Sequence, residues 1–477
     1  MMRMCIIAAA WCSACFAADI GQRLEALAGE DPRLGSAGIH VVEASTGKTL
    51  YQKDQDRLFS PASNLKILTS ALALERLRPD YRFITRVVRE ASGDVVLVGS
   101  GDPSLSGRAY PYQKDQLTGA PLQAIEQLAD AIAAHGILQI DGDVVGDDRL
   151  YPWDPYPLGW TLDDTRRGYG APVSALAVGD NAVTVAITAG SKIGEAAPLS
   201  LSPAFEYLTM ENHVRTTGRG SRFAVRARRV PGTRQWALTG TIPLGHAEAT
   251  QILPVDDPAL FAASALYEAL TQRGIAIRGR AVARHRAMGE PPVPVDGEEL
   301  ASRASPPLAE ILQLMDKLSN NLHAELILRE VGRVTRGEGS TEAGLTEMNA
   351  YLKAAGAQPG DWRLEDGSGL ARNTLVTPRL LTHILAREAQ SPDHDVWIKL
   401  LPAGGEDGTL SHRLCCMSGG RGVHAKTGTL SRTQALSGYA DSETHGQLAF
   451  SILVNDFAAP PGEVRRWIDK IATALLE

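Results

Sequence analysis

Cysteine is scarce in this sequence, with five residues among 477, and its placement excludes a disulfide framework. Three of the five fall within the first 16 residues, and the other two, Cys415 and Cys416, are neighbours. A bond between adjacent cysteines is strained, and neither group has the spacing of a metal site. We therefore expect Cys415 and Cys416 to be buried as small apolar side chains, with intermolecular pairing as the alternative.

Long runs of like charge are also absent, and 48 basic against 55 acidic residues give a formal net charge of −7. This balance argues against a nucleic-acid-binding surface. Hydrophobic residues make up 44% of the chain and charged residues 22%, which is ordinary for a soluble globular protein. A chain of this length can form about two to four domains.

The apolar run at residues 5–16 is too short to span a bilayer comfortably. Arg3 precedes it and Ala17 and Ala18 follow it, which is the order of a secretory signal that is later removed. We expect residues 1–18 to be this signal and the mature protein to be periplasmic. Lipidation is not expected, because Cys12 stands where a lipoprotein signal carries an aliphatic residue. Peripheral membrane association and the oligomeric state stay open.

A helix is predicted to begin at Ser60 and Pro61, because a serine hydroxyl can cap free N–H groups and proline suits the first turn. Apolar residues follow at helical spacing up to Pro79. This places Ser63 in the first turn and Lys66 one turn further on the same face. Taken alone, a Ser-x-x-Lys spacing is weak evidence, since an exposed lysine beside a capping serine gives the same pattern.

Short strand-like runs rich in Gly, Thr and Ser follow from about residue 87 to residue 293. Helical spacing then returns, and strands are predicted at 423–430 and 448–454. The outline is helices with antiparallel strands, interrupted by an insertion of roughly 200 residues. Further helices are expected at 305–319, 322–330, 341–355, 378–387 and 461–476; the apolar stripe of the last is expected to pack in the core rather than anchor to a membrane.

Three short motifs occur in a fixed order along the chain, and together they indicate an enzyme that forms an acyl-serine. They are Ser63 with Lys66 at a helix start, Ser319-Asn320-Asn321 between two helices, and Lys426-Thr427-Gly428 on a strand. Each is weak alone, but chance rarely produces all three in this order and in these contexts.

Acyl transfer from an amide needs a nucleophile, a proton acceptor, an oxyanion site and a clamp for the charged end of the substrate. Ser63 can attack, and Lys66 can accept its proton if burial or a second cation lowers its pKa. Ser319 can pass that proton to the leaving amine, while Asn321 holds the substrate amide. Lys426 can offer a cation to a terminal carboxylate.

Three further positions complete this arrangement. Thr427 offers a hydroxyl to the same carboxylate, and Gly428 permits a neighbouring backbone to come close. The backbone N–H groups of Ser63 and Thr429 are the expected oxyanion donors. No metal or organic cofactor is implied by this chemistry.

The chain resembles the low-molecular-mass class C penicillin-binding proteins, which are D-alanyl-D-alanine carboxypeptidases and endopeptidases. Besides the three motifs, the resemblance rests on segments spread through most of the mature chain: Gly99-Ser100-Gly101-Asp102-Pro103, Gly146-Asp147-Asp148, Tyr169-Gly170-Ala171-Pro172, Asp366-Gly367-Ser368-Gly369-Leu370, Leu401-Pro402, Gly408-Thr409-Leu410 and Ser437-Gly438-Tyr439.

This resemblance implies an α+β fold, with a transpeptidase domain like that of penicillin-binding proteins and β-lactamases, in which helices flank an antiparallel sheet. It also implies a large, mostly β insertion that forms two smaller domains. The expected catalytic domain is split between 19–86 and 295–477. The expected second domain comprises 87–175 and 245–294, and the third comprises 176–244.

The resemblance also implies substrates and further site residues. The substrates are peptidoglycan stem peptides and cross-links, and β-lactam antibiotics act as covalent inhibitors. Asp164 and Tyr169 lie where the family places insertion residues that reach toward the stem, and Arg372 resembles an arginine that lines the site. Ser431 stands where some members carry glutamine, and Tyr169 where some carry phenylalanine. Asp164 and Arg372 are equally compatible with solvated surface charges.

Two other functions share parts of this pattern. A β-lactamase or esterase uses the same catalytic groups, although the large insertion argues against a compact β-lactamase. A wall-binding scaffold without catalysis is the other, and its expected sign would be a broken motif. All three motifs are intact in this sequence.

Overall fold

The computed structural model describes residues 20–29, 31–115, 119–230, 232–415 and 422–477. The expected signal at 1–18 and Cys416 lie outside these residues. Cys415 is exposed, so its predicted burial is wrong. It lies in an irregular segment at the surface, where connecting segments normally run.

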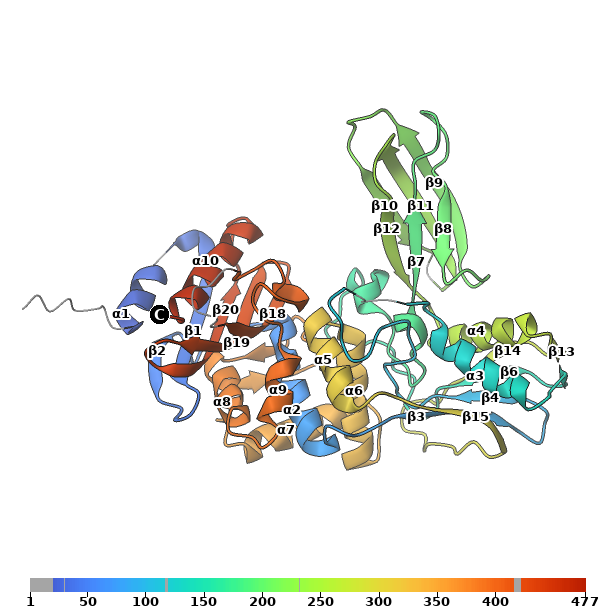
Figure 1. The fold of residues 1–477 in the computed structure, drawn as a ribbon, viewed down its shortest axis with the longest axis horizontal. Helices are drawn as coiled ribbons and strands as arrows, with labels where there is room; N and C mark the ends of the chain where they lie inside the picture. Colours follow the sequence, from blue (N-terminus) through green and yellow to red (C-terminus); the bar gives the residue numbers. More distant parts are fainter. Residues whose placement is uncertain (1–19, 30, 116–118, 231, 416–421) are drawn as a thin grey trace, which may run out of the picture.

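A five-stranded antiparallel sheet forms the centre of the first unit (Figure 1). Strands from the two ends of the chain are neighbours in it, since β1 pairs with β20 over eight residues. The strand order is β18 (Val423–Leu430), β19 (Thr433–Ser442), β20 (Gly446–Asn455), β1 (Ser36–Glu43) and β2 (Thr49–Lys53).

Helices cover both faces of this sheet, and its central strands β1, β19 and β20 are therefore buried on both sides. One face packs against α1 (Ile20–Leu27) and α10 (Pro461–Ala474), where Val464, Ile468 and Ile471 are buried as predicted. The other face packs against the remaining helices of this unit, α2 (Lys66–Leu77), α5 (Leu308–Leu318), α6 (Asn321–Arg336), α7 (Thr341–Ala354), α8 (Pro378–Glu388) and α9 (His394–Leu400).

The insertion leaves and rejoins this unit through two paired strands, β3 and β15, which lie next to each other in a second five-stranded sheet. Helices α3 (Gln123–Ala134) and α4 (Pro258–Gln272) pack on it around a separate apolar core. The strand order is β14 (Ala281–Arg284), β6 (Val144–Asp147), β4 (Val95–Val98), β3 (Ile84–Arg89) and β15 (Glu298–Ala304).

A small β-sandwich projects from the insertion (Figure 1). Two three-stranded sheets enclose its core, which centres on the buried Trp236 and Leu238. The first sheet contains β12 (Ala249–Pro254), β7 (Ala182–Ile187) and β8 (Leu199–Ser202), and the second contains β10 (Ala224–Arg229), β11 (Gln235–Pro243) and β9 (Thr209–Thr217). Two minor pairs join β5 (Gln139–Ile140) to β13 (Ala276–Ile277) and β16 (Trp362–Arg363) to β17 (Leu375–Val376).

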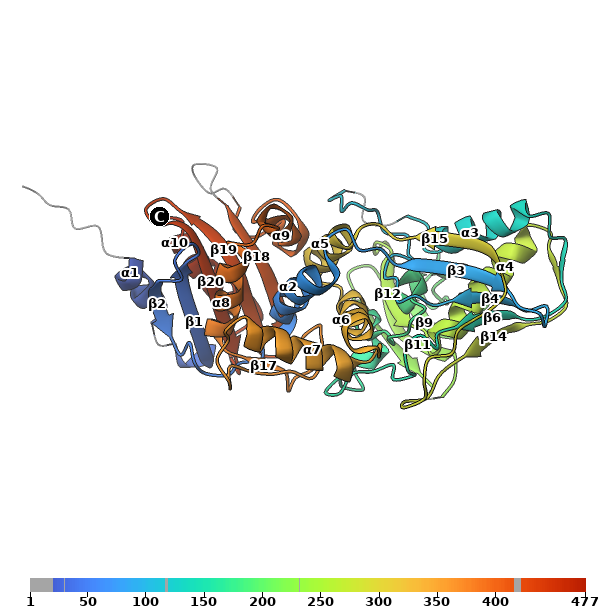
Figure 2. The same cartoon turned by 90° about the horizontal axis from the view of Figure 1, so that it is seen from below.

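Helices α2, α5 and α6 lie between the first sheet and the insertion, as Figure 2 shows. This matters for the site, because the first two motifs stand at the start of α2 and at the junction of α5 with α6. The third motif lies on β18, which is the edge strand of the sheet on that side.

Candidate active site

Ser63 lies in a tight turn that leads directly into a helix. It belongs to η2 (Ala62–Leu65), a 3-10 turn, and α2 follows without a break. Ala62 has a φ of 46°, a strained conformation for a residue with a side chain. The prediction that Ser60 caps the helix is wrong: its hydroxyl has no partner among the described residues, and its backbone is held instead by the side chain of Asn455.

The amine of Lys66 is completely buried next to the Ser63 hydroxyl. Its Nζ lies 3.0 Å from Oγ of Ser63, 2.7 Å from Oδ1 of Asn321 and 2.8 Å from the carbonyl oxygen of Ser368. Two effects lower the pKa of Lys66 to about 7. Burial is the larger, and the positive charge of Lys426 is the second. A large fraction of the amine is therefore neutral near pH 7 and able to accept the Ser63 proton.

The second motif lies at the corner between α5 and α6. Ser319 ends α5 in a left-handed conformation with a φ of 59°. Asn320 caps α6 through its side-chain oxygen, so Asn321 becomes the first residue of that helix. The Asn321 side chain then makes two contacts: Oδ1 accepts a hydrogen bond from Lys66, and Nδ2 donates one of 3.0 Å to the carbonyl of Tyr169.

Lys426 is buried on β18 and faces the second motif. Its Nζ donates hydrogen bonds to Oγ of Ser319, at 2.9 Å, and to the carbonyl of Thr427, at 3.0 Å. Burial lowers the pKa of Lys426 to about 8, against the opposing charge of Asp316. The hydroxyl of Thr427 donates to that of Thr409 at 2.8 Å. This amine is thus mostly charged at neutral pH, and it holds the Ser319 hydroxyl in place.

The remainder of the third motif lets β18 lie against the turn that carries Ser63. A side chain on Gly428 would place its Cβ 2.6 Å from the carbonyl oxygen of Pro61, so only glycine fits this approach. Thr429, one residue further, is exposed. Strand β18 is an edge strand, and the segment at 402–404 pairs with its outer edge at Val423 and Ala425. The outer backbone groups beyond Ala425 can pair with a bound peptide.

The sequence analysis missed two buried carboxylates that support the site. Glu325, one turn after Asn321 on α6, accepts hydrogen bonds from the backbone N–H groups of Gly367, at 3.1 Å, and Ser368, at 2.8 Å. It thereby holds the segment whose Ser368 carbonyl contacts Lys66. Burial raises the pKa of Glu325 to about 7. The sequence gives one indication of this role, because Glu325 lies four residues after Asn321 and therefore on the same face of the helix. That spacing is common and does not by itself identify a residue that supports the site.

Asp316 is the second such carboxylate. It is fully buried on α5, one turn before Ser319, and accepts a hydrogen bond of 2.7 Å from Ser70 of α2. Burial raises its pKa to about 6, while the charges of Lys426 and Lys66 act in the opposite direction. It supplies the negative charge that partly balances the two buried lysines.

The insertion contributes Asp164 and Tyr169 to the surroundings of Asn321. Asp164 is buried, and its carboxylate accepts hydrogen bonds from the backbone and hydroxyl of Thr161, at 3.0 Å and 2.6 Å, and from the Tyr169 hydroxyl, at 3.2 Å. The Tyr169 ring is 53% exposed. Asp164 thus fixes the loop, and Tyr169 presents its ring to solvent beside Asn321.

Arg372 and Ser431 are both exposed. The Arg372 guanidinium lies near enough to Tyr169 to lower the pKa of its phenol, against the larger raising effect of burial. Ser431 lies in the turn between β18 and β19, two residues beyond Thr429. Neither side chain has a hydrogen bond or ion pair among the described residues, so both are available to a ligand.

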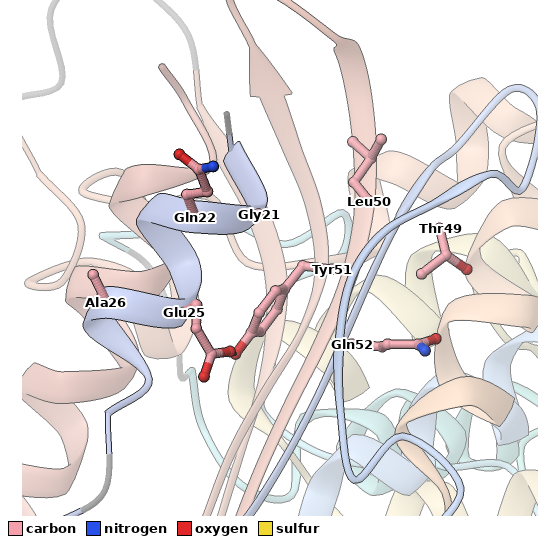
Figure 3. A pocket seen from close by; sticks show the side chains of 8 residues that line it. All are labelled: Gly21, Gln22, Glu25, Ala26, Thr49, Leu50, Tyr51 and Gln52. Atoms are coloured by element: carbon pink, nitrogen blue, oxygen red, sulfur yellow. The ribbon is translucent and has the colours of Figure 1, made fainter. Parts of the chain in front are cut away.

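A surface cavity of about 870 Å³ lies elsewhere, between α1 and β2 (Figure 3). The hydroxyl of Tyr51 donates a hydrogen bond of 2.8 Å to Glu25 within it. Strand β2 is the opposite edge of the sheet from β18, so this cavity is separate from the three motifs. Within the described ranges, no group of three or more His, Cys, Asp or Glu side chains could hold a metal ion.

The arrangement therefore contains a serine hydroxyl, a buried amine of lowered pKa, a second amine linked to a relay hydroxyl, and an open strand edge. Together with the helix-flanked antiparallel sheet, it defines the class of penicillin-binding proteins and β-lactamases. The family model that matches residues 20–475 narrows this class: the chain belongs to the D-Ala-D-Ala carboxypeptidase 3 (S13) family. It is thus a low-molecular-mass class C penicillin-binding protein and an enzyme of the serine D-Ala-D-Ala carboxypeptidase class.

Curated relatives and solved structures agree with this assignment. The chain is 34% identical over 471 residues to a D-alanyl-D-alanine carboxypeptidase of Actinomadura sp. (strain R39), with 94% of this chain and 83% of the relative covered. It is 24% identical to D-alanyl-D-alanine carboxypeptidase DacB of Haemophilus influenzae, covering 83% and 80%. The crystal structure of penicillin binding protein 4 (dacB) from Haemophilus influenzae has the same fold, with a TM-score of 0.78, 22% identity and coverage of 94% and 97%.

Proposed function

We propose that this protein is an exported serine D-alanyl-D-alanine carboxypeptidase that acts on peptidoglycan stem peptides through an acyl-Ser63 intermediate. The observation that carries the proposal is the position of the Lys66 amine, 3.0 Å from Oγ of Ser63, in a buried site that lowers its pKa to about 7. A base of this kind lies beside the nucleophile before substrate arrives. Family membership supplies the substrate class.

In the acylation step, Oγ of Ser63 attacks the carbonyl of the penultimate D-alanine while Lys66 takes its proton. The backbone N–H groups of Ser63 and Thr429 bind the developing oxyanion, a contribution of about 3 kcal/mol per donor. The C–N bond then breaks, and the proton that Lys66 took from Ser63 passes through the Ser319 hydroxyl to the leaving amine of D-alanine, which leaves Lys66 neutral again. Lys426 donates a hydrogen bond to Ser319 and orients it for this transfer. Water later attacks the ester by the same route and releases the shortened peptide.

The substrate's terminal carboxylate is proposed to bind at Lys426 and Thr427, next to the close approach that Gly428 permits. Asn321 is proposed to hold the peptide amide. Asp164, Tyr169, Arg372 and Ser431 are proposed to contact the stem further from the reacting bond. Support for this comes from the exposed ring of Tyr169 and from the exposed side chains of Arg372 and Ser431, which have no partner among the described residues.

Cleavage of cross-links is proposed as the same reaction with a larger leaving amine. β-Lactams are proposed to acylate Ser63, because their strained amide presents the same carbonyl. A further crystal structure of the Haemophilus influenzae protein contains a β-lactam, and its fold matches with a TM-score of 0.73 at 20% identity. Export to the periplasm is proposed from the order of residues 1–18. No helix of the described residues is long and apolar enough to cross a bilayer.

We also propose that the chain divides into a split catalytic unit, expected at 19–86 with 295–477, and two inserted units, expected at 87–175 with 245–294 and at 176–244. Separate apolar cores around the first sheet, the second sheet and the β-sandwich support three units. Strand β12 (Ala249–Pro254) pairs with β7 in the β-sandwich, so the boundary expected at 244/245 is wrong and the sandwich extends to Pro254.

The proposal is tested with Ser63→Ala and the matched control Ser60→Ala. Ser60 lies three residues away, and its hydroxyl makes no hydrogen bond within the described part of the chain. We expect the Ser63 variant to lose release of D-alanine from a pentapeptide and to lose labelling by fluorescent penicillin, while the control keeps both. Retained activity in Ser63→Ala would refute the mechanism. An acyl-enzyme that persists for hours supports a carboxypeptidase, and one that decays in seconds supports a β-lactamase.

A further inference from the structure

The β-sandwich of the insertion carries an unusual concentration of positive charge. Residues 212–247 contain seven arginines and no acidic residue, in a chain whose formal net charge is −7. This segment forms most of the β10-β11-β9 sheet, which projects away from the rest of the molecule (Figure 1). Nothing in the proposed reaction uses these side chains, so their distribution on the sheet needs a separate explanation.

The arginines of and before β10 share one face of the sheet. Arg222, Arg226 and Arg228 are exposed and separated by even numbers of residues, so their side chains point to the same side. The alternating residues Val225 and Ala227 turn inward and pack against the core of the sandwich. The charged face is therefore the outer one.

Strand β9 provides a second cationic row on that face. Thr239 of β11 is opposite Arg226 on one side and His213 on the other, and Thr241 is opposite Arg215. Paired residues point to the same side of a sheet, so Arg215 and His213 face outward together with the arginines of β10. The two rows flank β11 and lie about 9–10 Å apart, which is two strand spacings.

The floor between these rows is made of small residues, namely Ala237, Thr239 and Thr241. We call this surface the basic trough: a floor of these three residues between walls that carry Arg215, Arg222, Arg226 and Arg228. None of the four arginines has an ion-pair partner among the residues that the structure describes. The carboxylate on this face, Glu211, lies at one end, where it accepts a hydrogen bond from Gln235 and approaches His213 to 3.8 Å.

Unpaired like charges at this spacing repel one another, and an anion bound between them relieves that repulsion. Outward side chains follow each other along a strand at about 6.5–7 Å. The basic trough therefore suits an extended polymer with several anionic groups better than a single small anion. Guanidinium groups pair with carboxylates through two parallel hydrogen bonds, which favours arginine over lysine in such a surface.

We propose that the basic trough binds the carboxylates of peptidoglycan strands and holds the polymer while Ser63 acts on one of its stem peptides. This inference rests on the proposed function, because it takes the substrate polymer as its ligand. Each stem peptide ends in a free carboxylate, both before and after loss of D-alanine. The polymer thus presents repeated negative groups both at the active site and at a distance from it.

The surface is less suited to other anionic partners. Attachment to a bilayer normally uses aromatic or large aliphatic anchors beside the cations, and the floor of the basic trough has only alanine and threonine. Single-stranded nucleic acids bind by stacking on aromatic rings, which this floor also lacks. A carboxylate-bearing chain needs only the cations and a shallow path between them.

The test compares Arg226→Glu/Arg228→Glu with the matched control Arg465→Glu/Arg466→Glu, which makes the same change in charge on exposed residues of α10. Purified sacculi from which phosphate polymers have been removed serve as the probe, and binding is measured by co-sedimentation at low and high salt. Each pair is introduced both alone and together with Ser63→Ala, so that binding is measured without turnover.

We expect the trough variant to bind sacculi roughly tenfold more weakly or worse at low salt, and the control to bind like the parent protein. Release of D-alanine from a soluble pentapeptide should be unchanged in both, while release from sacculi should fall in the trough variant alone. Arg226→Lys/Arg228→Lys should keep part of the binding, because the charge remains but the paired hydrogen bonds do not.

Equal binding of the trough variant and the control would overturn the proposal. So would binding to vesicles of anionic lipid, or to single-stranded DNA, that is stronger than binding to sacculi and lost in the same variant. Amidation of the carboxylates in the sacculi should abolish the difference between variants, and persistence of that difference would also refute it. Failure of pentapeptide hydrolysis in the parent protein would instead refute the proposed function, and the co-sedimentation result would stand independently.

Discussion

Asn321 donates a hydrogen bond of 3.0 Å from its side-chain amide to the backbone carbonyl of Tyr169, while its oxygen lies 2.7 Å from the amine of Lys66. One side chain thus joins the candidate base to the insertion. Any movement of the Tyr169 loop changes the group that orients Lys66. The insertion is therefore part of the wall of the candidate site.

The rate of hydrolysis should depend on pH in a bell-shaped manner. Below the Lys66 pKa of about 7 its amine is an ammonium group and cannot accept the Ser63 proton, so activity falls toward acid. Above the Lys426 pKa of about 8 the positive charge beside the carboxylate site is lost, so activity falls toward alkali. The measurement is kcat/KM for a pentapeptide across this range. A profile that stays flat between pH 6 and 9 would contradict these roles.

Asn321→Asp should shift the acidic limb of that profile to higher pH. A carboxylate in place of the amide would lie next to Lys66 and stabilise its charged form, which raises the pKa by about one unit or more. It would also lose the donor to Tyr169. We expect kcat/KM at pH 7 to fall roughly a hundredfold, with partial recovery at higher pH. A uniform loss at every pH would mean that the residue acts only through structure.

Glu325→Gln should shift the acidic limb in the opposite direction. The charge of Glu325 raises the pKa of Lys66, and an amide in its place removes that effect. An amide also places an NH2 group where the second carboxylate oxygen accepts a hydrogen bond of 3.1 Å from Gly367. Two donors then face each other, so the segment should shift and the Ser368 carbonyl should lose its fixed distance to Lys66. We expect kcat to fall roughly tenfold, and the acidic limb of the pH profile to move to lower pH.

The matched control for that variant is Glu388→Gln. Glu388 is also a buried glutamate whose pKa burial raises to about 7, but it contacts Tyr351 and lies near the C-terminal end of α2, whereas Lys66 is at the start of that helix. Its replacement should change stability without moving the pH profile. If both variants moved the acidic limb of the pH profile equally, that shift could not be assigned to the contact of Glu325 with the Ser368 segment.

Gly369→Ala should destabilise the fold and slow acylation. Gly369 has a φ of 79°, and a Cβ there would lie 1.9 Å from the carbonyl oxygen of Ala62, next to the nucleophile. Gly446 has a φ of 69° with nothing within 4 Å of such a Cβ, so Gly446→Ala isolates the backbone strain. We expect the control to lose about 1 kcal/mol of unfolding free energy and Gly369→Ala to lose about 2 kcal/mol more.

Chemical denaturation measures both variants, and fluorescent penicillin measures acylation of the folded protein. Equal losses of stability in the two variants would show that the contact with Ala62 relaxes freely. Normal acylation in Gly369→Ala would show that the turn holding Ser63 tolerates movement.

Much of the architecture could be predicted from local pattern. The helices after residue 305, the strands near 423–430 and 448–454, and the apolar stripe of the last helix are confirmed, because each follows from side-chain spacing within one element. The cap expected at Ser60 and the burial expected for Cys415 are wrong. Both depend on neighbours that are distant in sequence, which local spacing does not identify.

The candidate site likewise combines residues that the sequence indicates with contacts that it does not. Order and residue type indicated Ser63, Lys66, Asn321 and Lys426, and the sequence also singled out Asp164. It could not indicate that the Asp164 carboxylate is bound by Thr161 and Tyr169 in its own loop. Glu325 was missed because a glutamate on a helix is usually a solvated charge, and only packing shows that this one is buried.

By itself, the sequence determined which chemical groups are present and in what order: a nucleophile at a helix start, a polar corner between helices and a lysine on a strand. Only the tertiary structure decided how those groups behave. The Lys66 amine is buried against residues 255 and 302 positions away, and the second lysine approaches it from the edge of the sheet. A pKa depends on solvent exclusion and nearby charge in three dimensions, and chain order encodes neither directly.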